Sequence, residues 1–387
     1  MAGLRYNIRE KGEVPKLSLE LCEKILSDLE KSKKPTLQST KCSLDNSIYV
    51  PSLGYLTPGN KKVKTELNVS SVKKMSRAIF MLELLLRNIN NGNTNTKREL
   101  YYMCKGMFKT NPELKPMDFE EQAESDASID FIGELLECYR EELNCYANDR
   151  GGDTYSNYLI VTETMTDGSK AQIDLSTLGT SPFVPRNKPQ SLKLEMKKKI
   201  DFCIVVESTG TANTLVANGI TKRHKCIIVG AQGVPSNAVR GWVRRIQEQL
   251  KIPTFFFGDL DAYTLQNIYR TLKAGSAASL IRNSNFSAPD VKFLGVLPED
   301  VKKYDLFSYD VKESNPSEMR SLKKAKDALA NDPFFQSKKN SKLAKILEWL
   351  IENKKRCEQQ AYYAVDGNDP LILEKILIEK IEKGKFV

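Results

Sequence analysis

Apolar side chains recur at helical spacing in the first part of the chain. One run follows the candidate N-caps Ser70 and Ser71, and its apolar positions are separated by 3, 4, 3 and 4 residues: Val72, Met75, Ile79, Leu82 and Leu86. A second helix is expected from Thr96, because Glu99 lies three positions later as in a capping box. A third is expected over residues 128–146, before β-prone segments at 158–162 and 171–175. This order fits a helix-turn-helix with a wing, and many helical bundles share it.

The pattern changes after a Pro- and Lys-rich stretch at residues 182–199, which we interpret as a boundary. Short apolar runs then alternate with helical segments. The expected strands cover residues 202–206, 226–229, 254–257 and 293–296. The expected helices between them cover residues 210–218, 236–250 and 265–272. Buried runs separated by helices predict a mainly parallel, doubly wound α/β sheet. From about residue 300 onwards the chain is rich in Lys and Glu and mostly helical in pattern.

The composition is that of a globular protein with a basic excess. The chain has 387 residues, of which 40% are hydrophobic and 28% charged, so disorder over most of it is not expected. Its 59 Lys and Arg against 49 Asp and Glu give a formal net charge of +10. That excess suggests an anionic partner, although a solvated basic surface explains it equally well.

Histidine and cysteine usage narrows the possible chemistry. His224 is the only histidine and lies between Arg223 and Lys225, so we interpret it as a surface residue and not as a catalytic base. The eight cysteines include no C-x-x-C pair, which favours free thiols in a reducing cytosol over a zinc site.

The N-terminus lacks an apolar signal core, and no apolar stretch approaches the ~20 residues of a membrane span. We therefore expect an intracellular, soluble protein without a membrane partner.

Carboxylates follow two of the expected strands. Glu207 comes directly after the strand at 202–206, and Asp259 and Asp261 follow the strand at 254–257. Ligands of open α/β sheets bind beyond the carboxyl ends of the strands, where these side chains would repel each other unless a cation lay between them. Mg²⁺ needs only one or two carboxylates with water or phosphate, so the pattern predicts a magnesium site. For each residue taken alone, a helix N-cap is an equally good explanation.

The second expected helix carries adjacent tyrosines. Tyr101 lies in register with the apolar face, which indicates core packing. Tyr102 lies about 100° further round, towards its i−4 neighbour Arg98 and its i+3 neighbour Lys105. A phenol beside two cations is favoured as phenolate and suits attack on phosphorus. Taken alone, Tyr102 would more often be an amphipathic surface residue.

Taken in order, these segments resemble the family of DNA topoisomerase VI A subunits and meiotic double-strand-break proteins. The segments that carry the resemblance are residues 96–102 with the tyrosines, Glu121-Gln122, Ser125-Asp126, residues 205–207, Gly233-Val234-Pro235 with Arg240, residues 259–261 and residues 288–296. The chain departs from the family pattern at Ser208 (commonly Lys), Ser236 (Asp), and at Ala262 and Thr264, which replace the Pro and Gly of D-x-D-Pro-Tyr-Gly.

The resemblance implies a fold and its division. It implies an α/β protein, α+β overall, with a winged-helix (CAP-like) domain followed by a Toprim-type domain with a mainly parallel sheet. The former would cover residues 66–182 with the catalytic tyrosine, and the latter residues 183–310 with the metal site. Residues 1–65 would form an N-terminal extension, and residues 311–387 a helical extension packed on the Toprim domain.

The resemblance also implies an activity, that of the DNA-cleaving subunit of an ATP-dependent type IIB topoisomerase, an isomerase. Tyr102 would attack a DNA phosphate to give a 5′-phosphotyrosyl bond, with Arg98 beside the phosphate. Glu207, Asp259 and Asp261 would hold Mg²⁺, and Glu207 would also act as general acid or base. The remaining predicted contacts to double-stranded DNA are Lys97, Lys105, Arg240 and Arg244.

Partners follow from the same resemblance. It implies a homodimer, in which the tyrosine of one protomer works with the metal site of the other. It further implies a heterotetramer with two GHKL ATPase B subunits, which would use the ATP, since this chain has no G-x-x-x-x-G-K-[ST] motif. The family suggests a nucleoid-associated protein of an archaeal cytoplasm. Two alternatives stay open: a recombination-initiating break protein with the same chemistry, and a catalytically silent DNA-binding scaffold.

Overall fold

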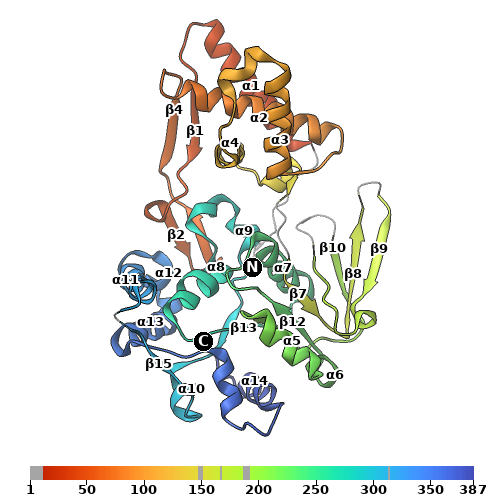
Figure 1. Cartoon of the computed structure of the whole chain (residues 1–387), viewed down its shortest axis with the longest axis vertical. Helices are drawn as coiled ribbons and strands as arrows, with labels where there is room; N and C mark the ends of the chain where they lie inside the picture. The colour runs from red at the N-terminus through yellow and green to blue at the C-terminus, as the bar shows by residue number, and fades with distance from the viewer. Residues whose placement is uncertain (1–11, 147–150, 166–167, 186–191, 313) are drawn as a thin grey trace. The chain divides into compact units, whose positions relative to one another are not determined.

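The computed structural model describes residues 12–146, 151–165, 168–185, 192–312 and 314–387. Contacts within the chain divide these residues into two compact units, which can be followed by colour in Figure 1. The helical unit comprises residues 12–46 and 58–146. The sheet unit comprises residues 47–57 and all described residues from 151 onwards.

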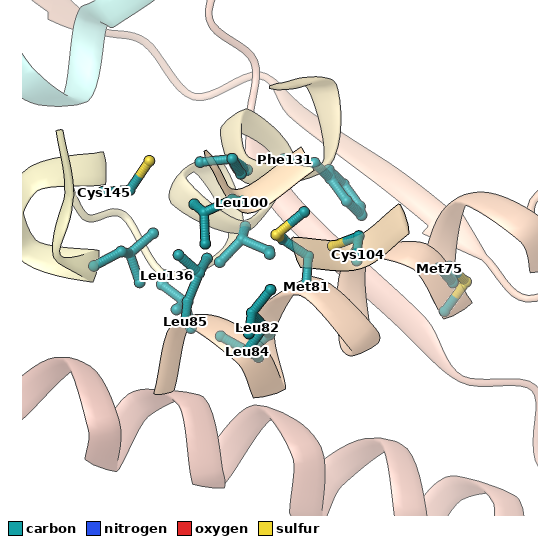
Figure 2. Close-up of a cluster of buried hydrophobic side chains, with 14 of the residues drawn as sticks. Met75, Met81, Leu82, Leu84, Leu85, Leu100, Cys104, Phe131, Leu136 and Cys145 are labelled. Carbon is teal, nitrogen blue, oxygen red and sulfur yellow. The ribbon is translucent and has the colours of Figure 1, made fainter. Parts of the chain in front are cut away.

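The helical unit is built around one apolar core. Its elements are α1 (Glu13–Glu30), β1 (Thr36–Thr40), β4 (Lys62–Glu66), α2 (Val72–Asn90), β5 (Asn95–Thr96), α3 (Lys97–Thr110), α4 (Gln122–Leu135) and β6 (Cys145–Tyr146). Figure 2 shows side chains from these helices meeting in the core, among them Met81 and Leu85 of α2, Leu100 and Cys104 of α3 and Phe131 of α4. Burying one such large apolar side chain contributes about 1.5–3 kcal/mol, so the amphipathic pattern determines which faces meet.

Two of the predicted helices agree with the structure and the third differs. The helices expected from the run after Ser71 and from Thr96 are α2 and α3. The third was expected over residues 128–146, whereas α4 begins at Gln122 and ends at Leu135. Glu137 then adopts a left-handed φ of 50°, which an α-helix cannot continue through. A short 3₁₀ turn follows at Arg140–Leu143, and Leu143 is buried there.

The sheet unit contains a five-stranded sheet in the order β14-β13-β11-β12-β7. Its strands are β7 (Asp153–Tyr155), β11 (Phe202–Val206), β12 (Cys226–Gly230), β13 (Thr254–Phe257) and β14 (Lys292–Gly295). All neighbours pair in parallel except β7, an antiparallel edge strand. The predicted mainly parallel sheet is therefore confirmed. Every residue of β11, β12 and β13 is buried, which is why their sequences read as unbroken apolar runs.

The connections of this sheet create a topological switch point. The chain leaves β11 through α5 (Thr209–Ala217) and α6 (Ile220–Arg223) and enters β12 on one side. It returns through α7 (Asn237–Leu250) to β13, on the other side of β11, and continues outward to β14. The connection from β13 to β14 starts with the π-helical turn η5 (Thr264–Tyr269), followed by α8 (Arg270–Ala274) and α9 (Asn283–Phe286). The connections after β11 and β13 thus diverge from adjacent strands, and such a point opens a crevice beyond the strand ends.

The strands expected to form a wing belong to the sheet unit. β8 (Leu159–Thr164) pairs with β9 (Lys170–Asp174) and with β10 (Leu192–Met196) in an antiparallel sheet ordered β10-β8-β9. The winged-helix grouping is therefore not confirmed. β10 also lies inside the stretch 182–199 that we interpreted as a boundary, part of which lies outside the described residues.

The C-terminal region adds helices to the sheet unit. They are α10 (Pro298–Lys303), α11 (Pro316–Asn331), α12 (Pro333–Gln336), α13 (Ser341–Asn353), the 3₁₀ turn η8 (Gln359–Ala364) and α14 (Ile372–Glu382). Short pairs β2 (Ser47–Val50) with β3 (Tyr55–Pro58), and β15 (Tyr309–Asp310) with β16 (Lys355–Arg356), accompany them. A buried ion pair, Arg270 to Asp332 at 2.8 Å, ties α8 to this region. No helix in the described ranges is both long and apolar enough to cross a bilayer.

Candidate functional site

The three predicted carboxylates come together at the switch point of the sheet. Glu207 directly follows β11, and Asp259 and Asp261 follow β13, the neighbouring strand. The Asp259 backbone N–H donates to Glu207 Oε2 at 3.1 Å. Thr264 links Glu207 to Asp261. Its hydroxyl donates to Glu207 Oε2 at 3.0 Å, and its backbone N–H donates to Asp261 Oδ1 at 2.6 Å.

A residue far along the chain completes these contacts. Gln359, at the start of η8, donates to Asp259 Oδ1 from its backbone nitrogen at 2.9 Å and from its side-chain Nε2 at 3.2 Å. Oδ1 of Asp259 is therefore held by two hydrogen bonds, while its Oδ2 accepts none from the described residues. The carboxylate of Asp261 accepts from Thr264 and from the backbone of Tyr263. The motifs alone missed Gln359, because nothing in the sequence near it signals a contact 100 positions away.

The environment of the cluster disfavours its negative charges. Burial, followed by the charge of Asp259, raises the pKa of Glu207 from its ordinary 4.5 to about 8. Burial is also the main cause that raises the pKa of Asp259 and of Asp261. The charge of Arg356 offsets only part of this effect, at Asp261. A bound cation would favour the ionised form of all three carboxyl groups.

The donor set fits Mg²⁺ as a partial shell. All ligands are carboxylate oxygens, which Mg²⁺ prefers. Within the described ranges, no three or more Cys, His, Asp or Glu side chains close around one point as a ready-made cage. Mg²⁺ tolerates this, because it usually keeps several waters and binds one or two carboxylates together with substrate phosphate.

Two departures from the family pattern act as helix caps. The Ser208 hydroxyl accepts from the backbone N–H of Thr211 at the start of α5, and the Ser236 hydroxyl accepts from that of Val239 at the start of α7, both at 3.3 Å. Serine is among the best N-cap residues, so these substitutions preserve the helix starts beside the sheet edge. Thr264 adds its hydroxyl bond to Glu207 where the family pattern has glycine.

The predicted nucleophile lies on α3 of the helical unit. Thr96 Oγ1 accepts from Glu99 N at 3.2 Å, and Glu99 Oε2 accepts from Thr96 N at 2.7 Å, which confirms the predicted capping box. Tyr102 is 59% exposed, and the Arg98 guanidinium lies 5.9 Å from its ring centre. Both line an open hollow of about 630 Å³. This surface can accept a phosphate between a phenol and a cation.

Tyr101 is placed differently from its neighbour. It is half-buried, its hydroxyl donates to the Glu120 carbonyl oxygen at 3.2 Å, and its ring packs edge-on to Tyr102 at 5.2 Å. The contrast favours Tyr102 as the reactive group, because the Tyr102 hydroxyl forms no hydrogen bond with the described residues.

The predicted lysine contacts are engaged by acidic side chains. Lys97 Nζ lies 3.1 Å from an Asp130 oxygen, and Lys105 Nζ lies 2.9 Å from an Asp118 oxygen. The bond to Asp118 raises the pKa of Lys105. Lys105 is thus held by a carboxylate of its own chain instead of standing free beside the phenol. In contrast, no ion pair holds Arg98 in the described part of the chain.

The predicted arginine contacts in the sheet unit are buried. Arg240 is 3% exposed and Arg244 is 2% exposed. Arg240 Nε donates to the Phe286 carbonyl at 2.9 Å, and Arg244 forms an ion pair with Glu248 at 2.7 Å. Their placement does not agree with direct phosphate contacts, because an incoming DNA backbone would have to displace packed protein. Their burial could not be predicted from the sequence, because arginines on a helix are normally exposed.

The single histidine has a structural contact. His224 Nε2 lies 3.2 Å from Glu374 Oε1, and Arg223 Nε donates to the same carboxylate at 2.7 Å. His224 is 29% exposed at its side chain, so it is more enclosed than the surface residue we expected. This ion-pair group joins α6 to α14.

Comparisons with known proteins match segments of both units. Residues 202–381 match the family model described as the Toprim domain of the topoisomerase 6 A subunit and Spo11, and residues 73–145 match the model described as type IIB DNA topoisomerase. The A subunit of type 2 DNA topoisomerase 6 from Methanocaldococcus jannaschii is 30% identical over 344 residues, which cover 89% of this chain and 88% of the relative. That of Pyrococcus abyssi is 28% identical over 376 residues, covering 95% and 94%. The A subunit of DNA topoisomerase 6 from Arabidopsis thaliana is 29% identical over 322 residues, covering 82% and 68%.

Proposed function

The chain belongs to the family of type 2 DNA topoisomerase 6 A subunits, and we propose that it is the DNA-cleaving subunit of a type IIB topoisomerase. The observation that carries the proposal is the group of three carboxylates at the switch point of a Toprim sheet, with pKa values raised as expected for a cation site. Its substrate is double-stranded DNA, and its activity changes DNA topology by passing one duplex through another.

The proposed chemistry is attack by Tyr102 on a backbone phosphate. The phenolic oxygen loses its proton and forms a bond to phosphorus, the bond from phosphorus to the 3′ oxygen breaks, and that oxygen gains a proton. Arg98 lies beside the phenol and is placed to hold the phosphate oxygens. Reversal of the same step rejoins the strand.

Glu207 is the proposed proton donor to the 3′ oxygen. Burial raises the pKa of Glu207 above its ordinary value, so this carboxyl group can give a proton to the leaving oxygen, and the return step uses it as a base. Glu207, Asp259 and Asp261 are the residues that would hold Mg²⁺. When bound, Mg²⁺ supplies positive charge that stabilises the negative charge developing at phosphate oxygens.

Assembly is part of the proposal. We propose a homodimer in which the tyrosine of one protomer serves the carboxylates of the other, so that each protomer cuts one strand. Two B subunits with a GHKL ATPase complete a heterotetramer and use the ATP. A winged-helix domain at residues 66–182 and the archaeal origin also stand as proposals. The three relatives are all named as A subunits of topoisomerase 6, which supports the topoisomerase over a recombination-initiating break protein.

The test is a cleavage assay on the reconstituted complex. Purified chain with its B subunit, Mg²⁺ and ATP should relax supercoiled plasmid and form covalent DNA adducts. Tyr102→Phe should abolish both, because it removes the attacking oxygen. Tyr101→Phe is the matched control and should retain both, since the Tyr101 hydroxyl donates its hydrogen bond to the Glu120 carbonyl of its own chain.

Each result decides a specific point. Loss of adducts in Tyr101→Phe with retention in Tyr102→Phe would show that the nucleophile is misassigned. Full cleavage by an Asp259→Ala, Asp261→Ala double variant would show that the metal site is misplaced. DNA binding by the parent without any adduct, with or without the B subunit, would favour the silent scaffold.

A further inference from the structure

A segment near the C-terminus lies against the loop that carries Asp259. Leu260 and Cys357 exchange backbone hydrogen bonds, with Leu260 N donating at 2.9 Å and Cys357 N donating at 3.1 Å. This pairing brings Gln359, two residues later, to the carboxylate of Asp259. The backbone pairing therefore fixes where Gln359 lies relative to Asp259.

Gln359 places two donors on a single carboxylate oxygen. Its backbone N–H and its Nε2 both bind Asp259 Oδ1, at 2.9 and 3.2 Å. Two donors on one oxygen fix the rotation of the carboxylate group and leave Oδ2 for another partner. Gln359 is only 2% exposed, so water does not compete freely for these bonds.

The other end of the same side chain has an unused acceptor. Gln359 Oε1 is buried and has no donor among the described residues. A buried acceptor without a donor costs about 1–3 kcal/mol and calls for an explanation. A water molecule of a cation's hydration shell is such a donor, and Mg²⁺ characteristically keeps several waters.

We propose that Gln359 is a positioning residue for a divalent-cation site at Asp259. It holds Oδ1 so that Oδ2 stays available to the ion, and its Oε1 accepts a hydrogen bond from a water on that ion. The proposal rests on the proposed function insofar as Asp259 is a metal ligand. It extends the site beyond the motif residues into the C-terminal region.

The test measures cation affinity on the full-length chain without DNA. Mn²⁺ is the probe, because free Mn²⁺ can be titrated by electron paramagnetic resonance and displaced with Mg²⁺. Gln359→Leu should raise the Mn²⁺ dissociation constant by about tenfold or more, the usual effect of losing a residue that orients a metal ligand. Gln360→Leu is the matched control and should bind like the parent, because Gln360 is exposed and its Nε2 donates to Thr211.

Further variants separate this proposal from the proposed function. Asp259→Asn should lose Mn²⁺ binding, which places the probe at the site. If Gln359→Leu has no cooperative melting transition and is therefore not folded, the Mn²⁺ titration is carried out on Gln359→Met instead. Parent-like Mn²⁺ affinity in the folded variant would overturn the role of Gln359, whatever the cleavage assay shows. Mn²⁺ binding that depends on Gln359 in a chain that forms no DNA adduct would support this role while refuting the proposed function.

Discussion

The two sets of candidate catalytic groups are held in opposite ways. In the sheet unit, three half-buried carboxylates share hydrogen bonds with Thr264 and Gln359, and burial raises their pKa values. In the helical unit, Tyr102 is 59% exposed and its cationic neighbour Arg98 is also exposed. The carboxylates are ordered before any ligand arrives, whereas the phenol is presented to solvent. Substitutions at the former should therefore change stability and activity together, and substitutions at the latter should change activity alone.

The largest expected effect is that of Glu207→Gln, which keeps the shape and removes the charge. We expect no detectable DNA cleavage, because the proposed proton donor and cation ligand is lost. In metal-free buffer the same variant should melt at a higher temperature than the parent. Each kcal/mol gained should raise the midpoint by about 2–4 °C in a domain of this size.

The raised pKa of Glu207 also predicts how the stability of the metal-free chain changes with pH. The folded-state pKa of Glu207, about 8, lies above its ordinary value of 4.5, so the folded chain holds the proton more tightly than the unfolded chain between these values. The free energy of unfolding therefore falls as pH rises through that window. Differential scanning fluorimetry with EDTA from pH 6 to 9 should show a steeper fall for the parent than for Glu207→Gln. Equal slopes would contradict the raised pKa, and the exposed residue Glu352, changed to Gln, serves as the control.

Arg98→Ala should reduce activity without a change in stability. We expect adduct formation to slow by about 10²-fold, as for loss of one group that stabilises charge in the transition state. The melting temperature should stay within about 1 °C of the parent, because no ion pair in the described fold depends on Arg98. The control is Arg87→Ala, which removes an exposed arginine of the same unit that pairs with Glu83. Equal loss in both variants would mean that general DNA affinity, and not contact with the reacting phosphate, explains the effect.

Thr264→Val should have the smallest effect. The change removes the hydroxyl that donates to Glu207 and also interacts with Asp261. It keeps the volume of a buried side chain and the backbone bond to Asp261. A hydrogen bond contributes about 0.5–1.5 kcal/mol net, so the Mn²⁺ dissociation constant should rise by roughly threefold to tenfold. Thr264→Ser restores a hydroxyl and should bind like the parent. If serine and valine weaken binding equally, packing and not the hydrogen bond is responsible.

Much of the fold could be predicted from local patterns. The buried runs at 202–206 and 254–257 coincide with β11 and β13, because a strand covered on both faces must be apolar throughout. Thr96 and Glu99 predicted the start of α3, because a capping box needs only four consecutive residues. The family resemblance drawn from the motif order is confirmed by the matches to A subunits of topoisomerase 6.

Other features depended on contacts that no local pattern contains. The end of the third helix at Leu135 follows from the left-handed backbone of Glu137, although apolar residues continue at helical spacing. Strand β8 pairs with β9 on one side and with β10 on the other, although β10 lies inside a stretch that looks like a linker. Arg240 and Arg244 are buried because α7 is enclosed on several faces, so basic residues could not be equated with a DNA-binding surface.

By itself, the sequence determined which groups can do chemistry: a tyrosine beside an arginine on a capped helix, and carboxylates at the ends of two apolar strands. These follow from residue type and short spacing, which act over a few positions. Only the tertiary structure decided that β11 and β13 are neighbours at a switch point, that Lys97 and Lys105 are paired with aspartates, and that Gln359 reaches Asp259. Sheet order, burial and ion pairing depend on segments that are distant in sequence and meet only when the whole core forms.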